Sequence, residues 1–379
     1  MQMRIGIFSA YYLPHLGGVE RYTSNLAREL AAANHSVTVI TSSHGGSRPQ
    51  FHGIEVIEVP SISIMNDRFP LIIPGPAFWH ALRKLSNNHF DAIVINTRYY
   101  PLCLLGKKIA DDQRLNPIVI DHSSGYISDN PGSMGKIMRL YEHAATRLIR
   151  RGSTRFFSVS QRGVIWLRTF GIQAEGTLTN CIDADEYRSL SSEHDWREEL
   201  AISDAPLVVF AGRLIKEKGV LKVIQACKAL VKQGYKLHLV IAGSGPLESI
   251  INEFTNERIH FVGSLTQPDL SALFKQADIF CLPTDYPEGL PTVLLEAAAH
   301  ECAIIVSDTG GAEEVIPDPS YGIILKDTDP RTISGAIAAY LDHPAALKEA
   351  GSRARSHVED TLTWKKTMEN LIQALEDGC

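Results

Sequence analysis

The sequence predicts an α/β protein that consists of two Rossmann-like halves. Its 379 residues are enough for two domains. In residues 3–185, short apolar or β-branched runs alternate with helical segments, which is the pattern of a parallel sheet covered on both faces. The same alternation begins again after a polar stretch at residues 189–204.

In the first half, a strand is followed by a glycine-containing loop and an amphipathic helix. Residues 11–18 include Gly17 and Gly18, and apolar residues recur at helical spacing over residues 19–32. The strands expected in this half are residues 3–8, 36–41, 54–59, 92–96, 118–120 and 156–159.

The second half repeats this order with its own strands and helices. The expected strands are residues 207–211, 236–242, 259–262, 279–282 and 303–307. The expected helices are residues 219–233, 246–255, 267–276 and 291–300. We therefore place domains at residues 1–185 and 204–362, with a linker at 186–203. We expect the ligand site at the carboxyl ends of the strands, in a cleft between the domains.

Composition excludes several classes of protein. With 44% hydrophobic and 21% charged residues, the chain is neither disordered nor collagen-like. Its apolar runs are far shorter than the ~20 residues of a membrane-spanning helix, and residues 1–8 do not have the pattern of a secretory signal. The six cysteines are far apart in the sequence, which argues against a disulfide scaffold or a zinc site. We expect a cytoplasmic protein.

The charges are distributed unevenly between the halves. Residues 1–185 carry 19 lysines and arginines against 14 aspartates and glutamates, whereas the rest of the chain carries 18 against 29. A basic first half is typical of a protein that places one side against an anionic surface. The alternative is that the asymmetry has no function.

The segment after the strand at 279–282 combines acidic residues with a helix start. Glu288 and Gly289 lie in a loop, and Pro291 stands where the first turn of a helix is expected. Backbone N–H groups from about Leu290 to Val293 would then be free to bind anionic oxygens. Glu296, inside the helix, could accept hydrogen bonds from two ribose hydroxyls. Alternatively, both glutamates are solvated.

Two further loops follow strands of the second half. Arg213 and Lys218 flank a short loop and could both reach a diphosphate, although they could equally be surface cations. Gly243 lies in Ala-Gly-Ser-Gly-Pro, where glycines permit a close backbone approach. This segment lacks the last glycine of a dinucleotide fingerprint, which argues against a dehydrogenase.

Together these motifs resemble those of glycosyltransferase family 4, which has the two-domain GT-B fold. The resemblance extends over nearly the whole chain and rests on five motifs: Gly-Arg-x4-Lys-Gly at 212–219, Glu288 and Glu296 separated by seven residues, Gly-Gly-x-x-Glu at 310–314, Gly-Gly-Val-Glu at 17–20 and Asn-x-x-Asp at 180–183.

The resemblance implies a role for each residue of the second half. Arg213 and Lys218 would bind the pyrophosphate of a nucleotide-sugar donor and neutralise the charge that builds up as the diphosphate leaves. Glu296 would hold the ribose. Glu288, with the backbone of Gly289, Leu290, Pro291 and Thr292, would contact the transferred sugar and the distal phosphate.

In the first half, the resemblance implies that Gly17 and Gly18 let a helix approach the phosphates closely. His122, in Ile-Asp-His-Ser-Ser, matches the family's histidine that contacts the donor sugar. Alternatively, His122 is a packed loop residue. The final segment, 363–379, would form a helix that crosses back to the first domain.

The resemblance also implies retention of the anomeric configuration. A double displacement would need a carboxylate nucleophile near the anomeric carbon. The sequence identifies none, since Asp121 is only adjacent to His122, so we favour attack on the same face. Neither Asp-x-Asp triplet, at 183–185 or 327–329, is expected to bind a metal, and no cofactor is expected.

The acceptor side carries a weaker signal. Residues 136–151 place apolar positions 137, 140, 141, 144 and 148 among basic positions 136, 139, 147, 150 and 151. Such a helix could lie on an anionic membrane or be a core helix with a basic edge. We expect a glycan or polyprenyl-phosphate-linked acceptor and peripheral contact with the inner face of the membrane. Residues 69–79, with three prolines, would be a loop.

The leading hypothesis is therefore a retaining transferase that moves a hexose or N-acetylhexosamine from a nucleotide-diphosphate sugar. Two alternatives remain: a sugar-nucleotide epimerase of the same fold, and a non-catalytic sugar-nucleotide or glycan-binding protein. No nucleic-acid partner is expected.

Overall fold

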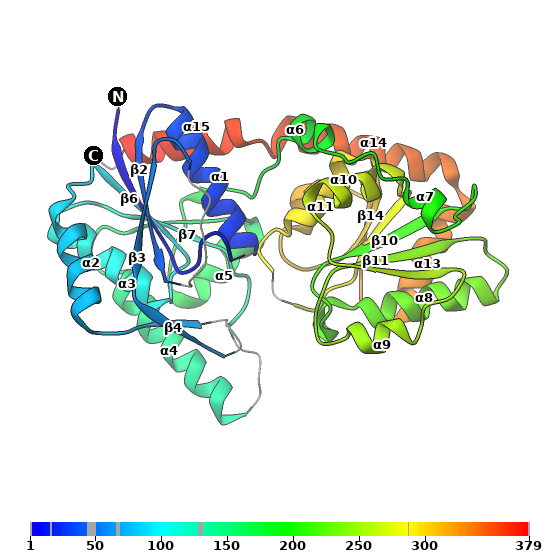
Figure 1. Ribbon diagram of the computed structural model, residues 1–379, viewed down its shortest axis with the longest axis horizontal. Coiled ribbons are helices and arrows are strands. Elements are labelled where there is room, and N and C mark those ends of the chain that lie inside the picture. Colours follow the sequence, from blue (N-terminus) through cyan, green and yellow to red (C-terminus); the bar gives the residue numbers. More distant parts are fainter. Residues whose placement is uncertain are drawn as a thin grey trace. The chain divides into compact units, whose positions relative to one another are not determined.

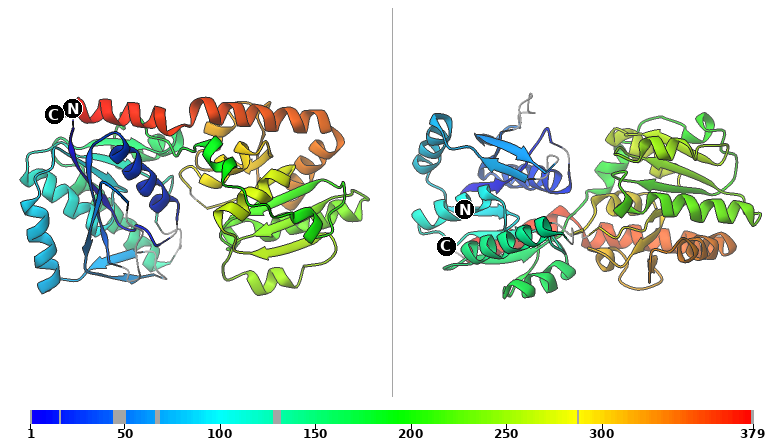
Figure 2. Two further views of the ribbon diagram at one scale, coloured as in Figure 1. Left: turned by 45° about the horizontal axis from the view of Figure 1, so that its top comes forward. Right: turned by 90° about the horizontal axis from the view of Figure 1, so that it is seen from below.

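The computed structural model describes residues 2–15, 17–43, 51–65, 69–127, 132–286 and 288–377. It divides the chain into two compact units (Figure 1). The first consists of Met1–Asn180 with Trp364–Cys379, and the second is Cys181–Thr363. Each unit contains a parallel sheet with helices packed on it (Figures 1 and 2).

The first unit has a seven-stranded parallel sheet in the order β3-β2-β1-β6-β7-β8-β9. Its strands are β1 Arg4–Ser9, β2 Ser36–Ser42, β3 Ile54–Val59, β6 Ala92–Asn96, β7 Ile118–Asp121, β8 Arg155–Ser158 and β9 Gly176–Thr177. Its helices are α1 Gly18–Ala32, α2 Pro76–Asn87, α3 Pro101–Asp112, α4 Ser133–Ile149, α5 Gln161–Leu167, the short 3-10 helix η1 Arg168–Phe170, and α15 Trp364–Glu376.

The second unit has a six-stranded parallel sheet in the order β12-β11-β10-β13-β14-β15. Its strands are β10 Leu207–Ala211, β11 His238–Ala242, β12 Ile259–Gly263, β13 Ile279–Leu282, β14 Ala303–Ser307 and β15 Ile323–Leu325. Its helices are α6 Ala184–Ser189, α7 Trp196–Glu199, η2 Lys216–Lys218, α8 Val220–Lys232, α9 Glu248–Asn252, α10 Gln267–Gln276, α11 Thr292–Ala299, α12 Ala312–Val315, α13 Pro330–Asp342 and α14 Pro344–Thr361.

The central strands of both sheets are buried along their whole length, which is why they stand out as apolar runs in the sequence. All residues of β6, β10, β13 and β14 are buried. The α/β prediction is thus confirmed. Within the described residues, no helix is both long and apolar enough to cross a membrane. The five described cysteines are free and buried, whereas Cys379 lies outside the described residues.

The predicted linker at 186–203 is wrong, because these residues belong to the second unit. Asp183 and Asp195 cap α6 and α7. Trp196 is 5% exposed, and its indole N–H donates to the carbonyl of Asp269 at 3.1 Å. The polar composition of this stretch reflects two capped short helices, and the change of unit falls between Asn180 and Cys181.

Residues 69–79 are also not the predicted loop. Phe69–Ile72 forms β5, which pairs antiparallel with β4 Ser61–Ile64, and α2 begins at Pro76. Pro70 is tolerated in a two-stranded ribbon because an edge strand leaves some N–H groups unpaired. Pro76 occupies the first turn of α2, where its missing N–H removes no helical hydrogen bond.

Candidate active site

In the second unit, the predicted donor residues gather where the strand order reverses. β10 is followed in sequence by β11 and β12 on one side, whereas β13 lies on its other side. The carboxyl ends of β10 and β13 therefore flank the switch point at which doubly wound sheets bind ligands. Arg213 and Lys218 follow β10, and Glu288 follows β13.

Two glycines allow the loops after these strands to touch. Gly243 follows β11 with φ +139°, and a Cβ there would lie 1.9 Å from the carbonyl oxygen of Gly212. Gly219 precedes α8 with φ +78°, and a Cβ there would lie 2.3 Å from the carbonyl oxygen of Pro283. A side chain at either position would be strained and would push the loops apart. Gly243 thus shapes the site through loop packing.

Lys218 and Glu288 form an ion pair, with side chains 15% and 12% exposed. The Thr284 hydroxyl lies 3.5 Å from the same glutamate oxygen, and the Lys218 ammonium is 5.8 Å from the ring centroid of Tyr286. The structure therefore brings together two residues that the sequence placed 70 positions apart. A ligand that binds Lys218 has to share it with Glu288 or displace that carboxylate.

The Arg213 side chain is exposed and makes no hydrogen bond or ion pair with any residue that the structure describes. A second ion pair, which the sequence did not reveal, lies nearby on the loop after β13. Lys222 Nζ is 2.6 Å from Asp285 Oδ2, and the Thr328 hydroxyl donates to Asp285 Oδ1 at 2.8 Å. Its members are 43 to 106 positions apart in sequence, so no local pattern could predict it.

The helix after β13 starts one residue later than predicted. Pro291 is the N-cap of α11, with φ −62° and ψ 121°, and Thr292 is the first helical residue. Leu294 N–H donates to the Pro291 carbonyl at 3.1 Å. The N–H groups of Thr292 and Val293 donate to no residue in the described part of the chain, as expected for a helix N-terminus.

The other predicted donor residues of this loop and helix differ in accessibility. Gly289 is half-buried, whereas Leu290 is 2% exposed and packs into the core of the unit. A contact of Leu290 with a ligand would therefore use its backbone. Glu296 lies one turn after Thr292 and is 4% exposed. Its role at a ribose stays a prediction.

In the first unit, the strand order reverses between β1 and β6, and Gly17, Gly18 and His122 lie near their carboxyl ends. Gly17 has extended backbone at the N-cap of α1, and Gly18 begins this helix. A Cβ on Gly17 would meet the Glu20 carboxylate at 2.3 Å, whereas one on Gly18 would meet nothing within 4 Å. A Cβ at position 17 would therefore require only the end of the Glu20 side chain to move, and packing requires glycine at neither position.

His122 follows β7 and is fixed on two sides. Its Nε2 is 3.3 Å from Asn96 Oδ1, and the Tyr22 ring meets it edge-on at a centroid distance of 4.8 Å. Burial lowers the pKa of His122 to about 3. The imidazole is therefore neutral at physiological pH and does not contribute a positive charge.

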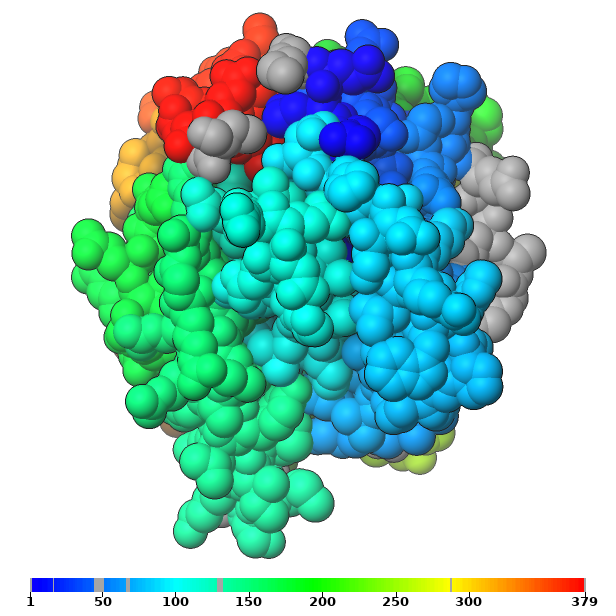
Figure 3. Space-filling model, turned by 90° about the vertical axis from the view of Figure 1, so that its left-hand side faces the viewer, coloured from blue at the N-terminus to red at the C-terminus, as the bar shows by residue number. Residues whose placement is uncertain are grey.

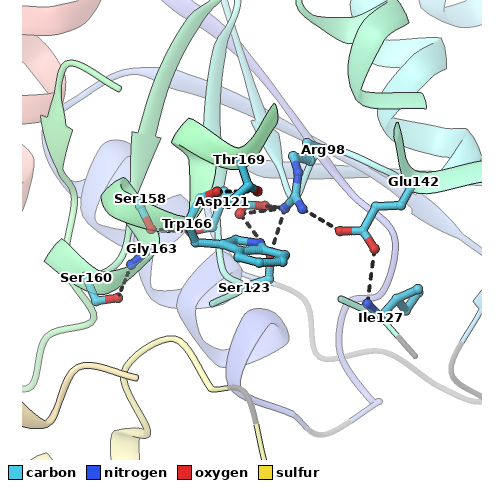
Figure 4. Close-up of polar contacts among 10 residues, drawn as sticks. All are labelled: Arg98, Asp121, Ser123, Ile127, Glu142, Ser158, Ser160, Gly163, Trp166 and Thr169. Carbon is cyan, nitrogen blue, oxygen red and sulfur yellow. Dashed lines mark hydrogen bonds and ion pairs between the residues drawn. The ribbon is translucent and has the colours of Figure 1, made fainter. Parts of the chain in front are cut away.

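Beside His122 lies a buried ionic network that the sequence did not reveal (Figure 4). Arg98 Nη1 donates to both carboxylate oxygens of Asp121, at 2.7 and 2.6 Å, and to the Ser123 hydroxyl at 2.7 Å. Its Nη2 donates to Glu142 on α4. The side chains of Arg98, Asp121 and Glu142 are all 0% exposed. Asp121 is thus fully engaged inside the protein.

Helix α4 has a buried face and an exposed apolar face. Glu142 and Ala145 are buried, whereas Met134, Ile137 and Leu140 are 57%, 59% and 73% exposed. Lys136 and Arg147 are exposed among them. We refer to Met134, Lys136, Ile137, Leu140 and Arg147 as the α4 surface. In Figure 3, the N-terminal part of α4 projects at the lower edge of the first unit.

Two sequence profiles match the chain, one in each half. The profile described as Glycosyltransferase Family 4 matches residues 16–186, and the profile described as Glycosyl transferases group 1 matches residues 192–357. Together they cover most of the chain. The chain belongs to glycosyltransferase family 4. The predicted family and GT-B fold of this glycosyltransferase are therefore confirmed.

Similar proteins cover the whole length of this glycosyltransferase. It is 24% identical over 388 residues to an uncharacterized glycosyltransferase of Methanocaldococcus jannaschii, which covers 99% of this chain and 98% of the relative. It is 25% identical to a GDP-mannose-dependent alpha-(1-6)-phosphatidylinositol monomannoside mannosyltransferase of Mycolicibacterium smegmatis, with 96% and 95% covered.

Solved structures share the fold. Sucrose-phosphate synthase from Thermosynechococcus elongatus matches with a TM-score of 0.74 at 21% identity, over 100% of both chains. HepE from Anabaena, solved in complex with UDP-glucose, matches with a TM-score of 0.76 at 16% identity, over 99% of this chain and 100% of that chain.

Proposed function

We propose that this glycosyltransferase moves a hexose or N-acetylhexosamine from a nucleotide-diphosphate sugar to a glycan or lipid-linked acceptor, with retention of configuration and without a metal ion. The observation that carries the proposal is the set of anion-binding groups at one switch point. Among the described residues, the Arg213 side chain is unpaired and the N–H groups of Thr292 and Val293 at the start of α11 have no acceptor, and Lys218 lies at the end of the same loop as Arg213. This combination suits a diphosphate.

These groups also suit the chemistry of the leaving group. As the bond to the sugar breaks, negative charge accumulates on the diphosphate, and preorganised cations stabilise it most when they are already in place. Arg213 and Lys218 would supply that charge. Glu288 pairs with Lys218 and would be released toward the transferred sugar when a diphosphate takes its place.

The state of Asp121 supports attack on the same face. A covalent intermediate requires a carboxylate that can reach the anomeric carbon. Asp121 ends the strand that His122 follows, but both of its oxygens accept hydrogen bonds from Arg98 and its side chain is 0% exposed. These contacts support a structural role for Asp121 and argue against its acting as the nucleophile of a double displacement.

The carboxylates of both Asp-x-Asp triplets have local partners, which supports transfer without a metal. Asp183 accepts from the N–H of Glu186 at 2.9 Å, and Asp185 pairs with Arg188. Asp327 and Asp329 accept backbone N–H groups two residues further along the chain, at 3.0 and 2.8 Å. Helix capping and turn formation account for these aspartates.

A lipid-linked acceptor at a membrane is supported by the α4 surface. It combines exposed apolar side chains with cations, the composition of helices that lie at anionic lipid headgroups. The mycobacterial relative is named as acting on a phosphatidylinositol monomannoside, which is in line with this assignment.

Donor use is tested by thermal shift with UDP-, GDP- and ADP-sugars, followed by NMR of the anomeric proton of the product. A donor that binds only the native state should raise the melting temperature. Arg213→Ala should abolish that shift and transfer, whereas Arg353→Ala, an exposed α14 arginine paired with Glu349, should do neither. Transfer should survive EDTA.

Three results would contradict the proposal. Inversion of the sugar when protein and donor are incubated alone would indicate an epimerase. Binding without transfer to any acceptor would indicate a binding protein. An inverted anomeric centre would exclude retention.

Membrane contact is tested separately by sedimentation with phosphatidylglycerol vesicles. Leu140→Glu should weaken binding about tenfold or more, because it puts a carboxylate among anionic headgroups. Ile250→Glu on α9, where the native side chain is 40% exposed, is the matched control. Equal binding by both variants would refute the assignment of the α4 surface.

A further inference from the structure

A chain of three hydrogen bonds connects the start of α1 with His122 at the switch point of the first unit. The Thr23 hydroxyl donates to the Val19 carbonyl at 2.7 Å. Asn96 Nδ2 donates to Thr23 Oγ1 at 2.8 Å, and Asn96 Oδ1 lies 3.3 Å from His122 Nε2. Thr23 and Asn96 are both 0% exposed, so solvent does not compete for the bond between them.

The direction of each bond follows from the one before it. A threonine hydroxyl has a single hydrogen, and either the 2.7 Å bond to Val19 or the 3.1 Å contact with the Ser9 hydroxyl uses it. Thr23 can then only accept from Asn96, so the amide NH2 faces Thr23 and the amide oxygen faces His122. An oxygen can only accept, so His122 has to carry its hydrogen on Nε2.

Further contacts hold the His122 imidazole beside Asn96. The edge contact with Tyr22 fixes one side of the imidazole, and the Tyr22 hydroxyl is itself bound to the Leu178 carbonyl at 3.2 Å. Next to Asn96, the Thr97 N–H donates to the Ile120 carbonyl at 2.8 Å. This backbone hydrogen bond fixes the end of β6 against the end of β7, which His122 follows.

We propose that Asn96 is a positioning residue that holds His122 as the Nε2–H tautomer and so leaves Nδ1 as a hydrogen-bond acceptor for a hydroxyl of the transferred sugar. This inference rests on the proposed function, and Thr23 acts in it by orienting the Asn96 amide. His122 Nδ1 has no hydrogen-bond partner among the described residues. A neutral ring with a free lone pair selects a ligand group that carries a hydrogen, as in enzymes where a second residue sets the histidine tautomer.

The tautomer has a consequence for substrate choice. Nδ1 can accept a hydrogen bond from a sugar hydroxyl, but it cannot form a hydrogen bond with an oxygen that carries no hydrogen. A donor in which the contacted hydroxyl is replaced by hydrogen or a methyl ether should therefore be transferred about tenfold more slowly or worse, because its hydrogen bond to Nδ1 is lost.

Two isosteric variants and a matched control test the series of hydrogen bonds from Val19 to His122. Thr23→Val removes the acceptor that orients Asn96, and Asn96→Leu removes the partner of His122 Nε2. Thr146→Val makes the same change as Thr23→Val at a buried α4 threonine whose hydroxyl has no partner in the described residues. We expect both chain variants to lower kcat about tenfold or more, and Thr146→Val to leave it unchanged.

The second readout is the tautomer itself, which a merely structural role would not change. Long-range proton–nitrogen NMR of protein labelled with 15N-histidine, with the His122 signal assigned by its loss in His122→Gln, should show a single Nε2–H form in the native chain. Thr23→Val should add the Nδ1–H form.

A native Nδ1–H or doubly protonated ring would overturn the inference, as would chain variants with unchanged transfer and tautomer. Absence of transfer by the native protein with every nucleotide sugar would instead refute the proposed function. In that case the NMR result alone decides whether Asn96 sets the tautomer, and the sugar contact is withdrawn.

Discussion

Glu288→Gln should tighten the binding of a nucleoside diphosphate and, at the same time, slow sugar transfer. Lys218 is paired with Glu288, and both side chains are largely buried. A diphosphate that binds Lys218, as we propose, would have to compete with this carboxylate. Glutamine keeps the shape of the side chain and can still contact the Thr284 hydroxyl, but it no longer competes as an anion.

The size of the effect follows from the burial of the pair. Two unit charges 4 Å apart attract by about 4 kcal/mol at an effective dielectric of 20, whereas exposed pairs contribute about 1 kcal/mol or less. At 15% and 12% exposure, the pair lies between these limits. If Glu288→Gln removes about 1–2 kcal/mol of this competing attraction, the Kd of the nucleoside diphosphate should be about 5- to 30-fold lower.

Lys218→Met should act in the opposite direction. It removes a charge-assisted hydrogen bond worth about 1.5–3 kcal/mol, so the Kd should rise about 10- to 150-fold. The double variant should bind like Lys218→Met, because without the lysine there is no ion pair for the glutamine substitution to release.

Isothermal titration with UDP, GDP and ADP measures these affinities, and initial rates measure transfer. Asp285→Asn is the control, because it neutralises a carboxylate on the same loop that pairs with Lys222 and not with Lys218. Unchanged or weaker diphosphate binding by Glu288→Gln, with the best of the three nucleotides, would refute the view that these residues compete at the phosphate site.

Three further predictions concern the fold and the site. Trp196→Ala should destabilise the second unit by about 3–5 kcal/mol in urea unfolding, whereas a change in a true linker would stay within about 0.5 kcal/mol. Gly243→Ala should lower the melting temperature, because its Cβ would meet Gly212, whereas Gly335→Ala, with nothing within 4 Å, should stabilise α13 by about 0.5–1 kcal/mol. Because burial depresses the pKa of His122 to about 3, unfolding takes up a proton as pH falls below about 6.5. The free energy of unfolding should therefore decrease by up to about 1.4 kcal/mol per pH unit as the pH falls from about 6.5 toward 3. In urea titrations at pH 6.5 and 5, His122→Gln should lose less stability between the two pH values than the native protein.

The sequence predicted the central strands well, since a strand that is buried on both faces leaves a continuous apolar run. The predicted bounds of 207–211, 279–282 and 303–307 match β10, β13 and β14. Local turn chemistry was harder to interpret. The prolines of residues 69–79 occupy an edge strand and a helix start, and both are positions where proline is tolerated.

For the candidate site, residues on neighbouring strand ends could be anticipated, but their pairing could not. Strand-end position brought Lys218 and Glu288 to one switch point, yet their ion pair depends on side-chain geometry across 70 residues of sequence. The contacts of Arg98 with Asp121 and Glu142 span 23 and 44 residues. Residues so far apart in sequence show no helix or strand periodicity that would predict their contact.

The distribution of charge separates two kinds of electrostatic signal. The predicted phosphate ligands, Arg213 and Lys218, lie in the acidic half of the chain, so net charge does not locate this site. A phosphate site needs only a few preorganised cations and N–H groups, and these act over a few ångströms. Two cations of the basic first half, Lys136 and Arg147, lie instead on the exposed α4 surface, beside apolar side chains. A bilayer interacts with many surface charges at once, so the sum over a domain carries information about a membrane contact that it does not carry about a ligand pocket.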